Sequence, residues 1–239
     1  MEAANPTESA LTISEVIGQV HCGRCLVPVP QEGELIWPPE QIEKLFGLLM
    51  QERSIGQFIF WSVGRDRVGD YHFCDFSGDG NECPCAVDPT SSIGRRDNVA
   101  VVIDGKRRLA SLYVGLVGLN KGSVPSRSQE TEDFYQSRKL YLNLLSGTGS
   151  SQECYDFRFL TESEASAKDE KTLWFKVGGV SSFTKPDEIG KCLIEKGLGK
   201  NKSAEECLVK LQRVIGEKRL LRCVVETDEE IGRVFLMFL

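Results

Sequence analysis

The chain has 239 residues, of which 41% are hydrophobic and 27% are charged, and its formal net charge is −6 at pH 7. This composition is typical of a globular protein with a sizeable core, built as one large domain or two small ones. The negative charge does not favour a nucleic-acid partner, although a local basic patch could still provide one. Residues 1–120 contain 10 basic and 16 acidic residues, whereas residues 121–239 are balanced. This asymmetry favours a chain of two parts.

The start of the chain and its cysteines indicate the compartment. Residues 1–10 lack the basic and apolar regions of a signal peptide, and no apolar run reaches the roughly 18–20 residues that span a bilayer. We therefore expect a cytoplasmic or nuclear protein that is not secreted and contacts no membrane. Its nine cysteines would be reduced there, and would serve as buried apolar residues, metal ligands or nucleophiles.

The first sixty residues are predicted to hold short extended segments and one clear helix. Residues 11–21 carry a mixed helix and strand signal, and residues 26–30 and 34–37 favour extended structure. A pair of prolines then introduces a helix over residues 40–53, because proline is tolerated in the first helical turn. The apolar residues that recur there at helical spacing are Ile42, Leu45, Phe46, Leu49 and Met50.

Two β-hairpins are predicted next. Residues 58–63 are rich in β-forming residues, and the alternating residues 68–76 are expected to pair back on them. Residues 98–103 and 107–119 are expected to form a second hairpin across Asp104-Gly105, because Asp-Gly is a strong two-residue turn signal.

The second half is predicted to begin after a linker or long loop at residues 120–131, which are polar. A helix is expected over residues 132–145, followed by strands over residues 154–160 and 173–177. The charged residues 161–171 between these strands are predicted to form a loop.

The last sixty residues are predicted to form two helices and a hairpin. The helices cover residues 186–196 and 203–215, and the second opens on a capping box at residues 203–206. Residues 220–225 and 233–239 would form the closing hairpin.

The order of these elements predicts the fold class. Helices and strands are mixed without regular β-α-β alternation, which favours an α+β fold with mostly antiparallel sheets and packed helices. The elements would group into two lobes, at residues 11–119 and 132–239, joined by residues 120–131.

A cluster of cysteines and histidines is the strongest chemical signal. The candidate ligands are His21, Cys22, Cys25, His72, Cys74, Cys83 and Cys85. Cys22 and Cys25 have the spacing of a zinc knuckle, and the other ligands of a Zn²⁺ site would come from the later members. However, Cys83 and Cys85 are closer than the usual spacer, and there is no second Cys-x-x-Cys. The same thiols fit buried core strands, so both interpretations stay open.

Catalytic signatures are sparse. Cys25 or Cys74 could act as a nucleophile beside a histidine, but no local signature of a thiol enzyme accompanies them. The chain also lacks the Gly-x-Ser-x-Gly elbow of hydrolases and the lysine-bearing phosphate loop of nucleotide-binding proteins.

Basic residues gather at the predicted turns of the first half. They are Arg65, Arg67, Arg95, Arg96, Lys106, Arg107 and Arg108. If the turns lie at one end of the fold, these residues form a basic patch for RNA or for an acidic protein. The alternative is that they are ordinary solvated turn residues.

Several segments resemble one known family. The resemblance is carried by VIGQVHCGRCLVPVP with ELIWPPEQIEKL, by SIGQFIFWS, by VAVVIDGKRRLASLYVG and by DEIGKCLIEKGL. Together they are similar to the cytomegalovirus unique-short-region gene family of the SUKH superfamily, most specifically at Asp104-Gly105 and Trp37-Pro38. The resemblance implies a non-enzymatic α+β module that binds other proteins and counters host defences. It supplies no catalytic residues and does not account for the Cys/His cluster.

The sequence thus predicts an intracellular binding protein whose partner is another protein. The expected contact surfaces are the loop at residues 77–96 and the arginine-bearing turns. A zinc-stabilised module that binds nucleic acid or protein is the first alternative, and a thiol-dependent enzyme is the second.

Overall fold

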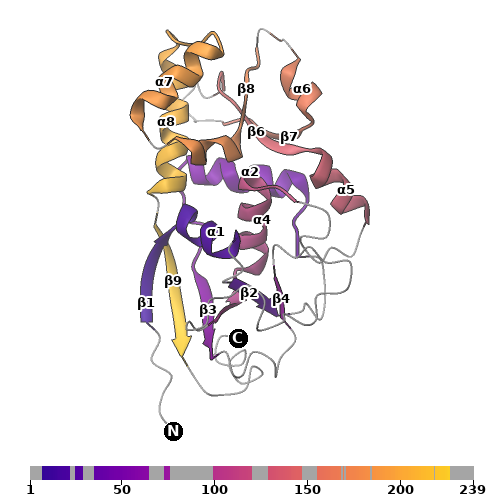
Figure 1. Ribbon diagram of the computed structural model, residues 1–239, viewed down its shortest axis with the longest axis vertical. Helices are drawn as coiled ribbons and strands as arrows, with labels where there is room; N and C mark the ends of the chain where they lie inside the picture. Colours follow the sequence, from indigo (N-terminus) through magenta and orange to yellow (C-terminus); the bar gives the residue numbers. More distant parts are fainter. Residues whose placement is uncertain are drawn as a thin grey trace.

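The computed structural model describes residues 7–21, 25–28, 35–64, 73–75, 99–119, 129–146, 155–167, 169, 171–183, 185–217 and 219–226. These residues form two β-sheets and a set of helices packed around one central helix (Figure 1). Five of the seven strand pairings described are antiparallel, which confirms the predicted α+β class with mostly antiparallel sheets.

The larger sheet, sheet A, has six strands. In spatial order they are β1 (Thr7–Thr12), β9 (Arg219–Glu226), β3 (Phe58–Val63), β5 (Val99–Asp104), β2 (Cys25–Pro28) and β4 (Phe73–Asp75). The pairs β1–β9, β3–β5 and β2–β4 are antiparallel, whereas β3–β9 and β2–β5 are parallel. The two central strands β3 and β5 are almost wholly buried and read as continuous apolar runs, as expected for strands covered on both faces.

The smaller sheet, sheet B, is antiparallel and has the order β7 (Phe157–Leu160), β6 (Lys139–Asn143), β8 (Trp174–Lys176). Alternate residues of a strand point to opposite faces. One face of sheet B accordingly joins the main core through Leu140, Leu142, Phe157, Phe159 and Phe175.

The helices pack between and beside these sheets. They are α1 (Ile13–His21), α2 (Pro39–Met50), α4 (Lys106–Leu116), α5 (Gln129–Ser137), α6 (Glu162–Ser166), α7 (Pro186–Glu195) and α8 (Lys202–Gly216), with the 3₁₀ helix η1 (Val177–Ser182). Figure 1 shows α4 in the middle of the long axis, with β1, β9, β2 and β4 toward one end and sheet B and α7 toward the other.

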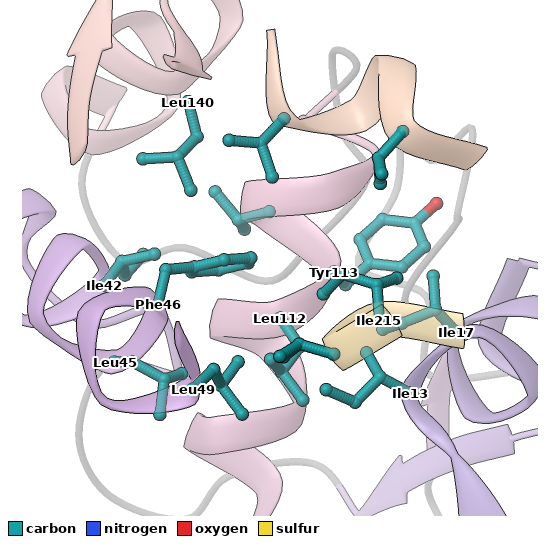
Figure 2. Close-up of a cluster of buried hydrophobic side chains, with 14 of the residues drawn as sticks. Ile13, Ile17, Ile42, Leu45, Phe46, Leu49, Leu112, Tyr113, Leu140 and Ile215 are labelled. Atoms are coloured by element: carbon teal, nitrogen blue, oxygen red, sulfur yellow. The ribbon is translucent and has the colours of Figure 1, made fainter. Parts of the chain in front are cut away.

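Helix α4 is enclosed by the rest of the fold. Residues 109–115 are seven successive buried positions, so this helix has no solvent-facing side over two turns. It contacts α1, α2, η1 and β6. In Figure 2, the α4 residue Leu112 lies between side chains of α2, such as Leu49, and side chains of α1, such as Ile13. The buried hydroxyl of Ser111 donates to the Arg107 carbonyl oxygen at 2.7 Å, which satisfies it within the helix.

Long periodic elements of the sequence are confirmed. The helix predicted at residues 40–53 is α2, and its five apolar residues are all buried. The strand predicted at residues 58–63 is β3, and the helices predicted near the C-terminus are α7 and α8. The cap of α8 differs in detail: Asn201 Oδ1 accepts from the Ala204 N–H at 3.1 Å, so Asn201 is the N-cap rather than Ser203.

Both predicted hairpins of the first half are wrong. Strand β4 pairs with β2 and not with β3, because β3 already lies between β5 and β9. Asp104-Gly105 leads from β5 into α4 instead of into a second strand. Gly105 has a left-handed φ of 86°, which suits a turn but serves here as the N-cap of the helix. Because α4 carries apolar residues on every side, its sequence shows no one-sided apolar stripe from which a helix could be predicted.

Three other assignments are corrected. The helix predicted at residues 132–145 divides into α5 and β6. In the segment predicted to be extended at residues 34–37, residues 35 and 36 form bends. The loop predicted at residues 161–171 contains α6, which begins with a capping box between Thr161 and Glu164.

The sheets do not follow the two halves of the sequence. Strand β9 comes from the predicted second lobe but lies in sheet A between β1 and β3. Residues 120–128 of the predicted linker and residues 233–239 of the closing hairpin lie outside the described residues. The division at residues 120–131 therefore stays a prediction, whereas sheet A takes strands from both sides of it.

Gly115 provides a test of how closely α4 is packed. A Cβ added there would overlap the Phe46 ring and lie 3.1 Å from Leu140 Cδ2, whereas a Cβ at Gly47 of α2 would meet nothing within 4 Å. We expect Gly115→Ala to lower the free energy of unfolding by about 1–3 kcal/mol through overpacking. Gly47→Ala should raise it by about 0.5–1 kcal/mol through helix propensity. Urea unfolding measures both, and equal effects at the two glycines would contradict this account of α4.

Candidate functional site

A groove opens where α1, the end of α4, η1 and the end of α8 meet. It encloses about 380 Å³, which is within the range of ligand-binding clefts. Its lining residues are Ser14, Ile17, Gly18, His21, Leu116, Val117, Gly178, Ser181 and Ile215. Because they come from four separate elements, only the folded chain brings them together.

Helix α1 supplies one wall through a stripe of small and polar residues. Ser14, Gly18 and His21 are spaced by four and three residues, so they share one side of the helix. The buried residues of α1 lie on its other side, and Ile17 is at the boundary, buried while still lining the groove. The amphipathic pattern of α1 therefore turns Gly18 and His21 toward the groove.

The apolar floor lies where the covering of α4 stops. Leu116 ends the helix and is half-buried, and Val117 after it is 39% exposed. Ile215 of α8 is buried at 3% exposure and closes the far side. Gly178 of η1 packs against the end of α4, because a Cβ there would overlap the Leu116 carbonyl oxygen. A larger residue at position 178 would push η1 away and widen the groove.

The rim of the groove carries a polar pair. His21 Nδ1 lies 3.4 Å from the Tyr113 hydroxyl oxygen, and the two ring centroids are 6.4 Å apart. The His21 side chain is exposed, whereas Tyr113 is buried in α4. Together with the serines of α1 and η1, His21 offers hydrogen bonds beside an apolar floor. Among the described residues that line the groove, no side chain is acidic.

The predicted zinc ligands are only partly described. Cys25 lies buried in β2, and Cys74 lies in β4, where it pairs with Val27 of β2. Cys22, His72, Cys83 and Cys85 fall outside the described residues. Within the part of the chain that the structure describes, no group of three or more His, Cys, Asp or Glu side chains is arranged to hold a metal ion. The zinc site therefore stays a prediction, and it would rest on the neighbouring strands β2 and β4.

The described thiols lie in places that disfavour a nucleophile. Burial raises the pKa of Cys207 to about 11 and also raises the pKa of Cys192. Both are thus protonated near neutral pH, whereas a reactive cysteine needs its thiolate. Cys25 is 1% exposed, which keeps its sulfur away from a dissolved substrate.

The predicted basic patch also falls largely outside the described residues, which exclude Arg65, Arg67, Arg95 and Arg96. Lys106, Arg107 and Arg108 occupy the first turn of α4 rather than the tip of a hairpin.

The guanidinium of Arg108 has a structural role. It donates to the Ile55 carbonyl oxygen at 2.5 Å, pairs with Asp104 at 3.2 Å and lies 5.1 Å from the centroid of the Phe58 ring. These contacts tie α4 to the chain before β3. Of the three predicted binding residues here, Lys106 is half-buried, Arg107 has an exposed side chain, and Arg108 is committed to the fold.

Glu43 is a carboxyl group whose pKa is shifted by the fold. It lies half-buried on α2, and its Oε1 accepts from the Phe159 N–H at 2.9 Å. Burial raises the pKa of Glu43, although the hydrogen bond from Phe159 opposes this. Perturbed carboxyl groups often mark active sites. Here the contact joins α2 to the edge strand β7, where a backbone N–H would otherwise lack a strand partner, so we assign Glu43 a structural role.

The Glu43 assignment predicts a pH dependence of stability. Its pKa is raised in the folded state above the ordinary value of 4.5, so folding disfavours the ionised form. The wild type should therefore lose stability relative to Glu43→Gln as pH rises from below 4.5 through the folded pKa. Glutamine keeps an oxygen that can accept from Phe159. Urea unfolding between about pH 4 and pH 8 measures this, with exposed Glu206→Gln as the control. A difference between Glu43→Gln and wild type that stays constant with pH would refute the assignment.

Sequence reasoning missed the groove. The sequence indicates His21 as a zinc ligand or as the partner of a nucleophilic Cys25, and it predicts a strand for residues 107–119. The spacing of Ser14, Gly18 and His21 was the one available signal, and it required choosing helix over strand for residues 11–21.

Within the residues described, none of the helices has the length and apolar character needed to cross a membrane. A scan against protein-family models and a search of curated proteins found no match to this chain.

Proposed function

We propose that this chain is a non-enzymatic intracellular binding protein that receives an apolar side chain of a partner protein in the groove between α1, α4, η1 and α8. The observation that carries the proposal is the combination of an open apolar floor with a polar rim. Protein interfaces commonly centre on such a pocket, into which one large apolar or aromatic residue of the partner inserts.

The construction of the groove supports this proposal. Its floor belongs to α4 and α8, whose neighbouring residues are buried in the main core, so the walls are held before a partner arrives. A preformed pocket lowers the entropy cost of binding. Val117 is one of few large apolar side chains exposed among the described residues, and its burial by a partner would contribute to affinity.

The family resemblance suggests the kind of partner. Similarity to the cytomegalovirus unique-short-region family is consistent with a viral protein that engages host factors to counter host defence. The rim residues His21, Ser14 and Ser181 would then provide hydrogen bonds around the inserted side chain.

Gly18 allows the groove to be blocked without disturbing the core. A Cβ at Gly18 meets nothing within 4 Å, although the residue lines the groove, so Gly18→Trp should place its ring in the hollow. The matched control is Gly190→Trp on α7, where a Cβ also meets nothing within 4 Å. The apolar dye 8-anilinonaphthalene-1-sulfonate is the first probe. We expect Gly18→Trp to lower its bound fluorescence severalfold and Gly190→Trp to leave it unchanged.

The same pair of variants then tests the partner. A protein captured by the wild type and by Gly190→Trp should bind Gly18→Trp at least about tenfold more weakly, a loss of about 1.4 kcal/mol. A partner that binds all three proteins equally would show that the groove is not the binding site.

A zinc-stabilised binding module is the second candidate, and the neighbouring positions of β2 and β4 favour it because these strands carry Cys25 and Cys74. It predicts about one equivalent of zinc in protein purified without chelator, and a large loss of stability when the metal is removed. Elemental analysis measures the stoichiometry, with Cys192→Ala as a control that should keep the metal. Protein that is folded and free of zinc would eliminate this candidate.

A further inference from the structure

The outer face of sheet B gathers positive charge. Its register places Tyr141 of β6 opposite Arg158 of β7 and opposite Lys176 of β8. Lys139 lies two residues before Tyr141 on the same strand, so it projects from the same face. Three basic residues therefore surround one tyrosine, on the face opposite the apolar residues that join the core.

The two lysines are held near each other without a counter-ion. Lys139 packs over Gly118, because a Cβ added to that glycine would lie 2.5 Å from the lysine Nζ. Gly118 also has a left-handed φ of 88°, which is a second reason for glycine at this position. Among the described residues, neither Lys139 nor Lys176 has an ion-pair or hydrogen-bond partner for its ammonium group. The pKa of Lys139 is lowered by burial and further by the charge of Lys176.

Tyr141 adds a neutral donor to this pair. Burial raises its pKa, and the charge of Glu162 raises it further, so the phenol keeps its proton near neutral pH. Its hydroxyl has no hydrogen-bond partner among the residues described. Tyr141 is buried at 7% exposure, but its hydroxyl is not among the fully enclosed atoms that lack a partner, so it can donate to an acceptor bound at the surface.

The remaining charges of this face are accounted for. Arg158 is committed to Asp156, with Nε 3.0 Å from Oδ1, and lies 5.6 Å from the centroid of the Trp174 ring. Glu162 is the acidic residue that acts on Tyr141. Set against Lys139, Lys176 and Arg158, the two carboxylates of Asp156 and Glu162 leave one positive charge in excess on this face.

We propose that Lys139, Lys176 and Tyr141 form a binding site for a phosphate group. A phosphate monoester carries nearly two negative charges and three strong acceptor oxygens, enough for two ammonium groups and one hydroxyl. Bound phosphate would also remove the repulsion between the two lysines. Gly118 directly follows Val117 of the groove, so the site borders the groove but does not depend on it.

Thermal unfolding in phosphate tests the site with inorganic phosphate as the probe. About 20 mM phosphate should raise the Tm of the wild type above that in sodium chloride of equal ionic strength, because a ligand that binds the folded state stabilises it. Lys176→Met and Tyr141→Phe should lose most of this rise. Lys200→Met, at an exposed lysine between α7 and α8, should keep it. Phosphoserine and adenosine monophosphate then distinguish a peptide from a nucleotide source of the phosphate.

Lys139→Met separates binding from folding. In chloride it should raise the Tm, because it removes a half-buried cation repelled by Lys176, and in phosphate it should gain nothing further. Equal phosphate responses in Lys176→Met and Lys200→Met, or no response beyond chloride in the wild type, would overturn the proposal. Free phosphate needs no occupant of the groove, so this outcome is independent of the Gly18→Trp experiment.

Discussion

The enclosure of α4 is the constraint on which the rest of this structure depends. A helix with seven successive buried residues cannot face water on any side, so other elements must cover it along its length. Helices α1 and α2, η1 and strand β6 all contact it. Close approach on one side requires Gly115, beside the Phe46 ring. Elements from widely separated parts of the sequence therefore meet at this helix, and they include the central strand of sheet B.

The groove is a consequence of the same constraint. Covering of α4 ends at Leu116, where the chain leaves the core and Val117 becomes exposed. Gly178 lets η1 approach the last carbonyl groups of the helix, and α1 approaches from the other side with a small residue, Gly18, facing the gap. Small residues on two walls leave a hollow that their neighbours do not fill. A site of this kind is rigid because its floor continues into the core.

Charged residues divide into two kinds in this fold. Arg108 and Glu43 bind backbone groups of distant segments, and their hydrogen bonds hold elements together. Such groups cost free energy when buried and are tolerated because their polar atoms are satisfied. Lys139 and Lys176 differ, since they lie close together on one sheet face and have no anionic partner among the described residues. A fold keeps uncompensated like charges together at a cost in stability, so they are better explained by binding than by folding.

The sequence by itself determined the α+β class and the elements whose periodicity is long and one-sided, such as α2 and α8, because one apolar stripe needs one covering surface. It did not determine α4, whose apolar residues point in every direction and match no period. The pairing of β4 with β2, and the place of β9 beside β1 and β3, join residues far apart in the chain, which local patterns do not encode. The groove and the lysine pair were decided by tertiary structure alone. Ser14, Ile215 and Gly178, like Lys139 and Lys176, acquire their neighbours only when the elements around α4 have packed.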